Sequence, residues 1–384
     1  MLYKTKSKIS MLIILVFVLI FLPSCNKKNV EIENTNINNK KSDLNEIIEW
    51  TEDNDSNINM EIIELNTSNF ITWPDIYGDH VVFANYDISG EERRQIHLFN
   101  ILTKKDEIIY LNQDSLMIED TRIGNGWVFW VEGNWTTENT NRDWTIKAYN
   151  IQNKQIKTIR SASQLTGRSS LVPRIDNEEN MIVWLEGYFD TDDNLKHAIY
   201  SYNVNSDEVK KIADVSHVEN PYTIIKPRDN TICFADFIDD HWFIRIIELN
   251  TMKETTINFG GRFSGSPCSD GRIVAWKQNI KELCYIDLKN LKEEIVIPIR
   301  NPFLFDVYDG SIFMSATVDK GRHIYKCDVT DKTITCITKS AEKKYNEFNF
   351  KFTNFYADKM VFTSTRALEP IGVKYDLVIV DGIN

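Results

Sequence analysis

Short apolar runs recur along the chain from residue 58 onward, each directly after a turn residue such as Gly, Asn or Asp. The runs are rich in β-branched and aromatic residues, and no helical periodicity accompanies them. Apolar runs of this kind between turn residues predict a series of short β-strands. Seven copies align, 39 to 55 residues apart, on Val81, Trp127, Ile182, Ile232, Ile273, Ile312 and Met360.

A second pattern follows each run: an aliphatic residue, two further positions, an apolar residue, and then Asn, Asp or Glu. Its copies are residues 96–100, 146–150, 199–203, 244–248, 283–287, 324–328 and 377–381. Most copies lead through a charged or Thr-rich segment into one more apolar strand. Four short strands in a unit of about 45 residues are typical of a β-propeller blade. The predicted fold is therefore an all-β, seven-bladed β-propeller, with six blades as the alternative if one unit is misread.

The last unit has material for only three strands, and the missing strand is found at the start of the repeats. Residues 60–66 (MEIIELN) match residues 106–112 (DEIIYLN) at an offset of 46, which is also the spacing between Val81 and Trp127. We therefore predict that an N-terminal strand closes the last blade, because closure removes a free sheet edge. The propeller then covers residues 58–384.

Two segments resemble the blade repeat of TolB-like propellers: residues 73–83 (WPDIYGDHVVF) and residues 266–276 (SPCSDGRIVAW). The resemblance implies the propeller architecture and no partner or site residue. TolB proteins have a separate N-terminal α/β domain, six blades and a soluble periplasmic form. In this chain a predicted lipid anchor and tether stand in place of the α/β domain.

Residues 1–24 have the features of a secretion signal, with Lys4, Lys6 and Lys8 before a 12-residue apolar run. Such a run is too short to cross a membrane of about 30 Å as a helix. The sequence Leu-Pro-Ser-Cys at residues 22–25 resembles the lipobox of bacterial lipoproteins, which implies a lipidated Cys25 and a location on the extracytoplasmic face of the cell membrane. The alternative is an ordinary membrane anchor followed by a buried cysteine. The polar residues 25–57 are expected to form a flexible tether.

Composition narrows the function classes. The 384 residues contain 44 Lys and Arg against 56 Asp and Glu, for a net charge of -12. This acidic balance, with no basic stripe, argues against nucleic-acid binding. No Gly-x-Ser-x-Gly, His-Glu-x-x-His, Cys-x-x-Cys or Gly-x-Gly-x-x-Gly motif is present, so neither a metal nor a cofactor is predicted. The sequence leaves open whether two carboxylates form a pair that cleaves glycosides, because the distance between them in space is not readable from the sequence.

Two cysteines flank a predicted hairpin turn symmetrically. Cys327 and Cys336 could face each other, and an extracytoplasmic location permits a disulfide. Directly opposed strand cysteines often have poor disulfide geometry, however, so free thiols are the preferred interpretation.

Acids interleaved with aromatics follow the second strand of the early blades and make up most of the candidate binding residues. Such loops suit sugars or cationic groups, although the aromatics could simply pack and the acids be solvated, which is the preferred interpretation. Trp73, Arg122 and Arg174 are expected at the channel mouth, where the arginines either bind an anion or, as we prefer, pair with Glu119 and Asp120. The loop candidates are Tyr86, Glu132, Trp135, Glu186, Tyr188 and Trp242.

The sequence favours a monomeric, lipid-anchored binding or scaffold module for a protein partner or a glycan. The alternative is a carbohydrate-active enzyme, a glycoside hydrolase or a lyase, with its site at the channel mouth. A structural role in envelope assembly is a third hypothesis.

Overall fold

The computed structural model divides the chain into two units, Met1–Ile32 and Glu33–Asn384. It describes residues 33–35, 51–53, 59–64, 70–86, 93–113, 116–134, 142–218, 224–258, 267–279, 282–289, 295–297, 302–318, 321–338, 347–367 and 373–383. The predicted signal sequence and Cys25 therefore lie outside the described residues. Among the described residues, no helix is long and apolar enough to cross a membrane.

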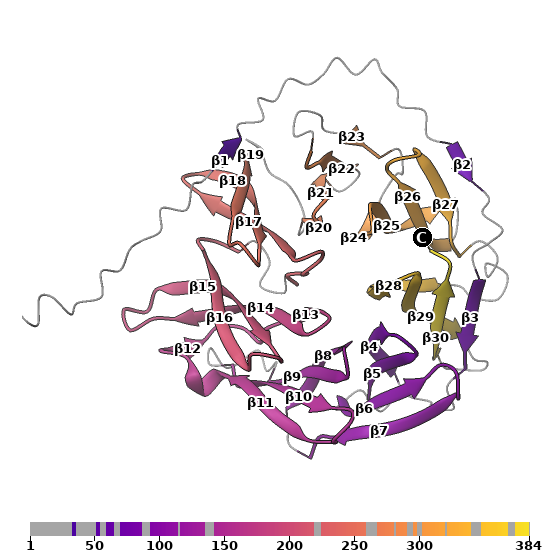
Figure 1. Cartoon of the computed structure of the whole chain (residues 1–384), viewed down its shortest axis with the longest axis horizontal. Coiled ribbons are helices and arrows are strands. Elements are labelled where there is room, and N and C mark those ends of the chain that lie inside the picture. The colour runs from indigo at the N-terminus through magenta and orange to yellow at the C-terminus, as the bar shows by residue number, and fades with distance from the viewer. Residues whose placement is uncertain are drawn as a thin grey trace, which may run out of the picture. The chain divides into compact units, whose positions relative to one another are not determined.

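The second unit is all-β, and its strands form seven blades arranged in a ring (Figure 1). Blade 1 contains β4 (Phe70–Tyr77), β5 (His80–Tyr86), β6 (Arg93–Asn100) and β7 (Lys105–Leu111). Blade 2 contains β8 (Met117–Gly124), β9 (Trp127–Gly133), β10 (Trp144–Asn150) and β11 (Ile156–Ser161), followed by the short 3-10 helix η1 (Ala162–Gln164). Blade 3 contains β12 (Arg168–Ser169), β13 (Ile175–Glu178), β14 (Met181–Phe189), β15 (Leu195–Asn203) and β16 (Glu208–Val215).

The remaining blades follow the same antiparallel order. Blade 4 contains β17 (Thr231–Ile238), β18 (His241–Glu248) and β19 (Glu254–Asn258), with an inner bridge between Arg228 and Thr231. Blade 5 contains β20 (Cys268–Ser269), β21 (Ile273–Asn279), β22 (Glu282–Asp287) and β23 (Ile295–Val296). Blade 6 contains β24 (Pro302–Tyr308), β25 (Ser311–Val318), β26 (Gly321–Asp328) and β27 (Thr333–Cys336). Blade 7 contains β28 (Glu347–Tyr356), β29 (Lys359–Ala367), β30 (Val373–Asp381) and β3 (Asn59–Ile63).

The predicted closure of the ring is confirmed. Strand β3 pairs antiparallel with β30, in a register that runs from Asn59 opposite Asp381 to Ile63 opposite Leu377. The first described repeat strand thus becomes the outer strand of the last blade. A sheet that would otherwise end in an unpaired edge is completed by the other end of the chain.

The hydrophobic core lies between the blades rather than at one centre. The described residues form seven separate clusters of buried apolar side chains, and each cluster joins two neighbouring blades. The cluster that includes Phe83 of β5 and Val361 of β29, for example, joins blade 1 to blade 7. A closed ring has as many interfaces as blades, so the clusters exclude the six-bladed alternative.

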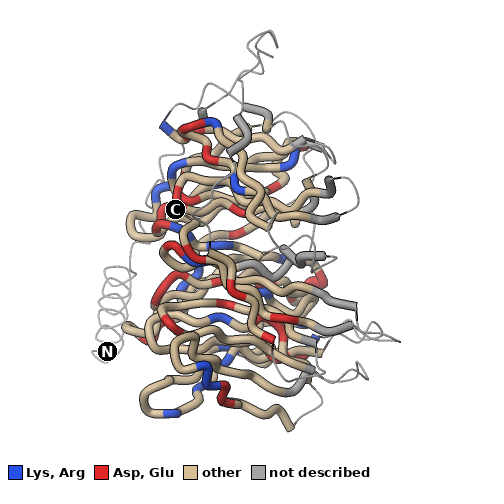
Figure 2. Tube along the Cα trace, turned by 90° about the vertical axis from the view of Figure 1, so that its right-hand side faces the viewer, with Lys and Arg blue, Asp and Glu red and all other residues tan. Residues whose placement is uncertain are grey.

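Two short strands come from the segment predicted as a tether. Strand β1 (Glu33–Thr35) pairs in parallel with β19, and β2 (Thr51–Asp53) pairs in parallel with β27. Both therefore extend the outer edge of a blade. Acidic and basic residues are mixed along the described part of the chain that Figure 2 shows.

The cysteines follow the preferred interpretation. Cys327 pairs in register with Ile334, and Cys336 pairs with Tyr325, so the two cysteines do not oppose each other. Both are free thiols. The turn between β26 and β27 is therefore not centred where the symmetric spacing suggested.

Candidate functional site

A ring of equivalent positions lines the central channel, one residue from the innermost segment of each blade. In six blades, this residue pairs in register with a residue at the same place in the second strand of its own blade. In blade 4 the equivalent residue is Lys226, which lies two residues before Arg228, the residue that forms a bridge to Thr231. Six of the seven are buried. In chain order they are Asp75, Arg122, Asp176, Lys226, Cys268, Asp306 and Asn354.

Opposite charges within this ring pair between blades. Arg122 Nε donates to Asp176 Oδ1 at 3.1 Å, and Lys226 Nζ donates to Asp306 Oδ2 at 2.5 Å. The guanidinium of Arg228 lies between two of the acids, 3.6 Å from Asp176 and 3.9 Å from Asp306. Burial alone would lower the pKa of Arg228, but these carboxylates raise it, so it stays charged.

Asp75 has a different environment from the other acids of the ring. Its carboxylate accepts two backbone N–H groups, from Ile76 at 2.9 Å and from Ile123 at 2.7 Å. Burial raises the pKa of Asp75 to about 7, although Arg122 and the two N–H groups act in the opposite direction. Near neutral pH this carboxyl is therefore able to hold or release a proton.

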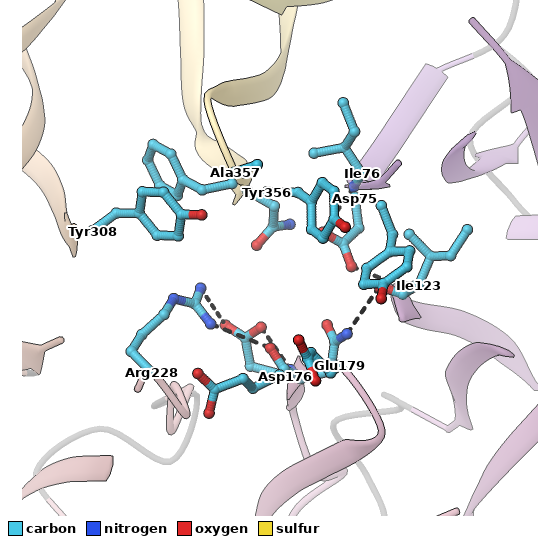
Figure 3. A pocket seen from close by; sticks show the side chains of 14 residues that line it. Asp75, Ile76, Ile123, Asp176, Glu179, Arg228, Tyr308, Tyr356 and Ala357 are labelled. Carbon is cyan, nitrogen blue, oxygen red and sulfur yellow. Dashed lines mark hydrogen bonds and ion pairs between the residues drawn. The ribbon is translucent and has the colours of Figure 1, made fainter. Parts of the chain in front are cut away.

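A cavity of about 300 Å³ opens beside this ring (Figure 3). Arg228 and Asp176 lie on one side of it, and Asp75, Tyr308 and Tyr356 face them from the other. The lining combines four carboxylates, one guanidinium and three phenol rings, which come from blades 1, 3, 4, 6 and 7, and blade 2 adds an isoleucine. Its residues are Asp75, Ile76, Tyr77, Ile123, Asp176, Asn177, Glu178, Glu179, Arg228, Tyr308, Asn354, Phe355, Tyr356 and Ala357.

The residues predicted for the channel mouth, Trp73, Arg122 and Arg174, contact other side chains of the protein. Arg174 stacks on the ring of Trp73 at 3.9 Å, and its Nε donates to Asp120 Oδ2 at 2.5 Å. The preferred pairing of Arg174 with Asp120 is thus confirmed, whereas Arg122 hydrogen-bonds Asp176. Neither arginine lines the cavity.

The two glutamates predicted for the loops are buried in the blades. Glu132 accepts the indole N–H of Trp130 at 2.9 Å and the ammonium of Lys147 at 2.7 Å. Glu186 repeats this arrangement one blade later, where it accepts Trp184 Nε1 at 2.9 Å and a bidentate contact from Arg160. These acids therefore stabilise the packing of the blades, since both of their charges are already paired.

The predicted aromatics have separate locations. Tyr188 lines an open groove on blade 3, and Trp242 packs against Phe237 with ring centroids 5.1 Å apart. Trp135 and the side chain of Tyr86 lie outside the described residues. Among the residues that the structure describes, no group of three or more His, Cys, Asp or Glu side chains is placed to hold a metal ion.

No protein-family model matches the sequence, and no curated protein matches it. Solved structures do match. The β-propeller domain of the Trilobed protease from Pyrococcus furiosus is 14% identical with a TM-score of 0.54, over 80% of this chain and 93% of that chain. Oligogalacturonate lyase from Vibrio parahaemolyticus is 12% identical with a TM-score of 0.51, over 84% of this chain and 96% of that chain.

The chain is a β-propeller. This much of the resemblance to TolB-like propellers is confirmed, and at these identities the likeness shows the fold alone. TolB from Acinetobacter baumannii also matches, at 12% identity and a TM-score of 0.42 over 67% of this chain and 64% of that chain, which is too distant to support an argument. The Pyrococcus furiosus domain has an open velcro topology, whereas in this chain β3 completes the last blade.

Proposed function

We propose that this protein is a lipid-anchored binding module on the extracytoplasmic face of the cell membrane, and that the channel cavity receives a positively charged side chain of a protein partner. The observation that carries the proposal is the charge of the lining, which has four carboxylates against one guanidinium. The net charge of -12 adds long-range attraction for a basic partner.

The negative charge that is free to act on a ligand lies at the edge of the cavity. Inside, Asp176 is already offset by Arg122 and Arg228. At the turn before β14, by contrast, neither Glu178 nor Glu179 has an ion-pair partner among the described residues. Glu178 accepts the backbone N–H of Asn230 at 3.0 Å, and its charge helps to raise the pKa of Arg228. These two carboxylates would therefore attract a cation to the entrance.

Aromatic rings complete a site of this kind. The rings of Tyr77 and Tyr356 are tilted against each other with centroids 4.3 Å apart, and Tyr308 lines the same cavity. Aromatic faces attract ammonium and guanidinium groups, and a carboxylate beside them adds direction. A volume of about 300 Å³ accommodates a lysine or arginine side chain but little more.

A titration of short blocked peptides tests this site. We expect a soluble chain of residues 45–384 to bind a Gly-Lys-Gly or Gly-Arg-Gly peptide and not the norleucine analogue, as measured by calorimetry. The double substitution Glu178→Gln, Glu179→Gln should weaken binding about tenfold, because a half-buried carboxylate (Glu178) and an exposed one (Glu179) each contribute about 0.5–1 kcal/mol.

The matched control is the double substitution Glu208→Gln, Asp331→Asn, which removes two exposed acids away from the cavity. It should bind like the parent. Equal binding of the norleucine peptide, or equal loss in the control, would contradict the cation site. For the anchor, Cys25→Ser should move the full-length protein from the membrane fraction to the soluble fraction.

A carbohydrate-active enzyme is the second candidate, and Asp75 favours it. A buried carboxyl with a pKa of about 7 beside the ionised Asp176 suits a general acid. Turnover of an oligosaccharide that is lost in Asp75→Asn but kept in Glu178→Gln, Glu179→Gln would establish this role instead.

A further inference from the structure

A second concave site lies at the other end of β14 from the channel cavity. Glu178 and Glu179 precede β14, whereas Tyr188 near its end lines a groove of about 510 Å³ on blade 3. This volume is within the range of small-ligand sites. The groove is lined by Thr166, Tyr188, Asp190, Leu195, Lys196, His197, Asp214, Val215 and Ser216.

The charged residues of this groove offset one another. Asp190 Oδ2 lies 3.7 Å from Lys196 Nζ, and Asp214 forms an ion pair with Lys211. The lining therefore has little net charge to select an ionic ligand. The other polar side chains of the lining are those of Thr166, Tyr188, His197 and Ser216.

One buried polar group in the lining lacks a partner. His197 is buried, with 8% of the residue exposed, and its Nδ1 has no hydrogen-bond partner among the described residues. Burial and the nearby His217 lower the pKa of His197, so the imidazole is neutral at neutral pH. A buried polar atom without a partner is unfavourable, so a ligand gains affinity when a rotation of the imidazole brings Nδ1 into contact with it.

The walls of the groove are held in place. Asp236 of β17 accepts the backbone N–H groups of Ser216 at 2.8 Å and His217 at 3.2 Å, and Arg245 holds the same carboxylate at 2.7 Å. On the opposite side, Asp190 accepts the backbone N–H groups of residues 192 and 194. Preformed walls reduce the conformational entropy that the protein loses when a ligand binds.

We propose that this groove binds a segment of a neutral oligosaccharide. Either tautomer of His197 is satisfied by a sugar hydroxyl, because a hydroxyl both donates and accepts a hydrogen bond. The ring of Tyr188 offers an apolar surface to a sugar face, and the hydroxyls of Thr166 and Ser216 extend the hydrogen-bonding capacity. An ionic ligand gains little here, since both lysines are already engaged by acids.

The groove proposal is independent of the channel proposal. The substitutions Glu178→Gln and Glu179→Gln lie at the opposite end of β14 and should leave sugar binding unchanged. Conversely, a variant of the groove should leave binding of the lysine peptide unchanged.

The test is a panel of neutral tetra- to hexasaccharides (gluco-, manno-, galacto-, xylo- and chito-series) against residues 45–384, with oligogalacturonate as the charged comparator. We expect saturable binding of at least one neutral series, measured by calorimetry, and weaker binding of the charged one. His197→Phe keeps a planar ring but removes both nitrogens, and Tyr188→Ala removes the half-buried ring. Each should weaken binding at least tenfold.

The matched control is His241→Phe, which removes an exposed histidine on neighbouring blade 4, outside the groove. It should bind like the parent. Thermal melts establish that each variant is folded, and Tyr188→Ala keeps the test valid if His197→Phe does not fold. The proposal is overturned if the folded parent binds no member of the panel, if oligogalacturonate binds best, or if Tyr188→Ala binds like the parent.

Discussion

Replacing Glu186 with Leu should lower the free energy of unfolding by about 3 kcal/mol. The carboxylate is fully buried, and its loss leaves the guanidinium of Arg160 and the indole N–H of Trp184 without their partner. Removing one member of a buried ion pair typically costs about 3–5 kcal/mol, because the remaining charge is not resolvated. Urea unfolding followed by tryptophan fluorescence and by circular dichroism measures the change.

An exposed pair provides the control, because it also joins neighbouring blades. Lys154 and Glu107 lie 3.0 Å apart on the surface of blades 2 and 1, and Glu107→Gln should leave the unfolding curve unchanged within error. The double substitution Glu186→Leu, Arg160→Met should recover part of the lost stability, because it leaves no unpaired guanidinium. A single Glu186→Leu variant as stable as Glu107→Gln would show that the ion pair does not stabilise the interface.

Removing β3 should destabilise the ring most of all. In a chain of residues 66–384, the edge of β30 is open, and Met60, Ile62 and Ile63 no longer pack against the two clusters on either side of blade 7. Partial burial of three such side chains and their strand contributes about 5 kcal/mol, which is comparable to the stability of a whole domain. We expect the melting temperature to fall by about 10 °C or more relative to residues 54–384.

A peptide that restores the missing strand distinguishes loss of the β3–β30 pairing from misfolding of the shortened chain. Addition of residues 56–66 as a peptide should raise the melting temperature of the shortened chain, since the peptide adds to the free edge of β30. The same peptide with Ile62→Asp should not. An unchanged melting temperature on removal of residues 54–65 would mean that the closure contributes nothing to stability.

The fold was predictable because the same requirement recurs in every blade. Each blade must bury apolar side chains against two neighbours, so Val81, Trp127 and their equivalents recur every 39 to 55 residues. The closing strand was predictable for the same reason, because residues 60–66 repeat the outer strand of blade 1.

The sites were less predictable because their contacts cross between strands and blades. Glu132 and Glu186 stand beside aromatics in the sequence, but their partners Lys147 and Arg160 are known only from the register and from blade packing. Asp75 and Asp306 did leave a signal, since both begin an Asp-Ile/Val-Tyr sequence at the same place in the repeat. Alignment of that position across the seven units would have revealed the channel ring.

The pairing of β3 with β30 also determines how the domain can be rearranged. Asn59 and Asp381 face each other across two paired strands, which are about 5 Å apart. A short linker between these ends would preserve the pairing of β3 to β30 within the seven blades and would remove only the added edge strands β1 and β2, so the chain could be reopened in a loop between any two blades. The point at which the chain begins is thus separable from the order of the blades around the ring, and the propeller is a natural candidate for circular permutation.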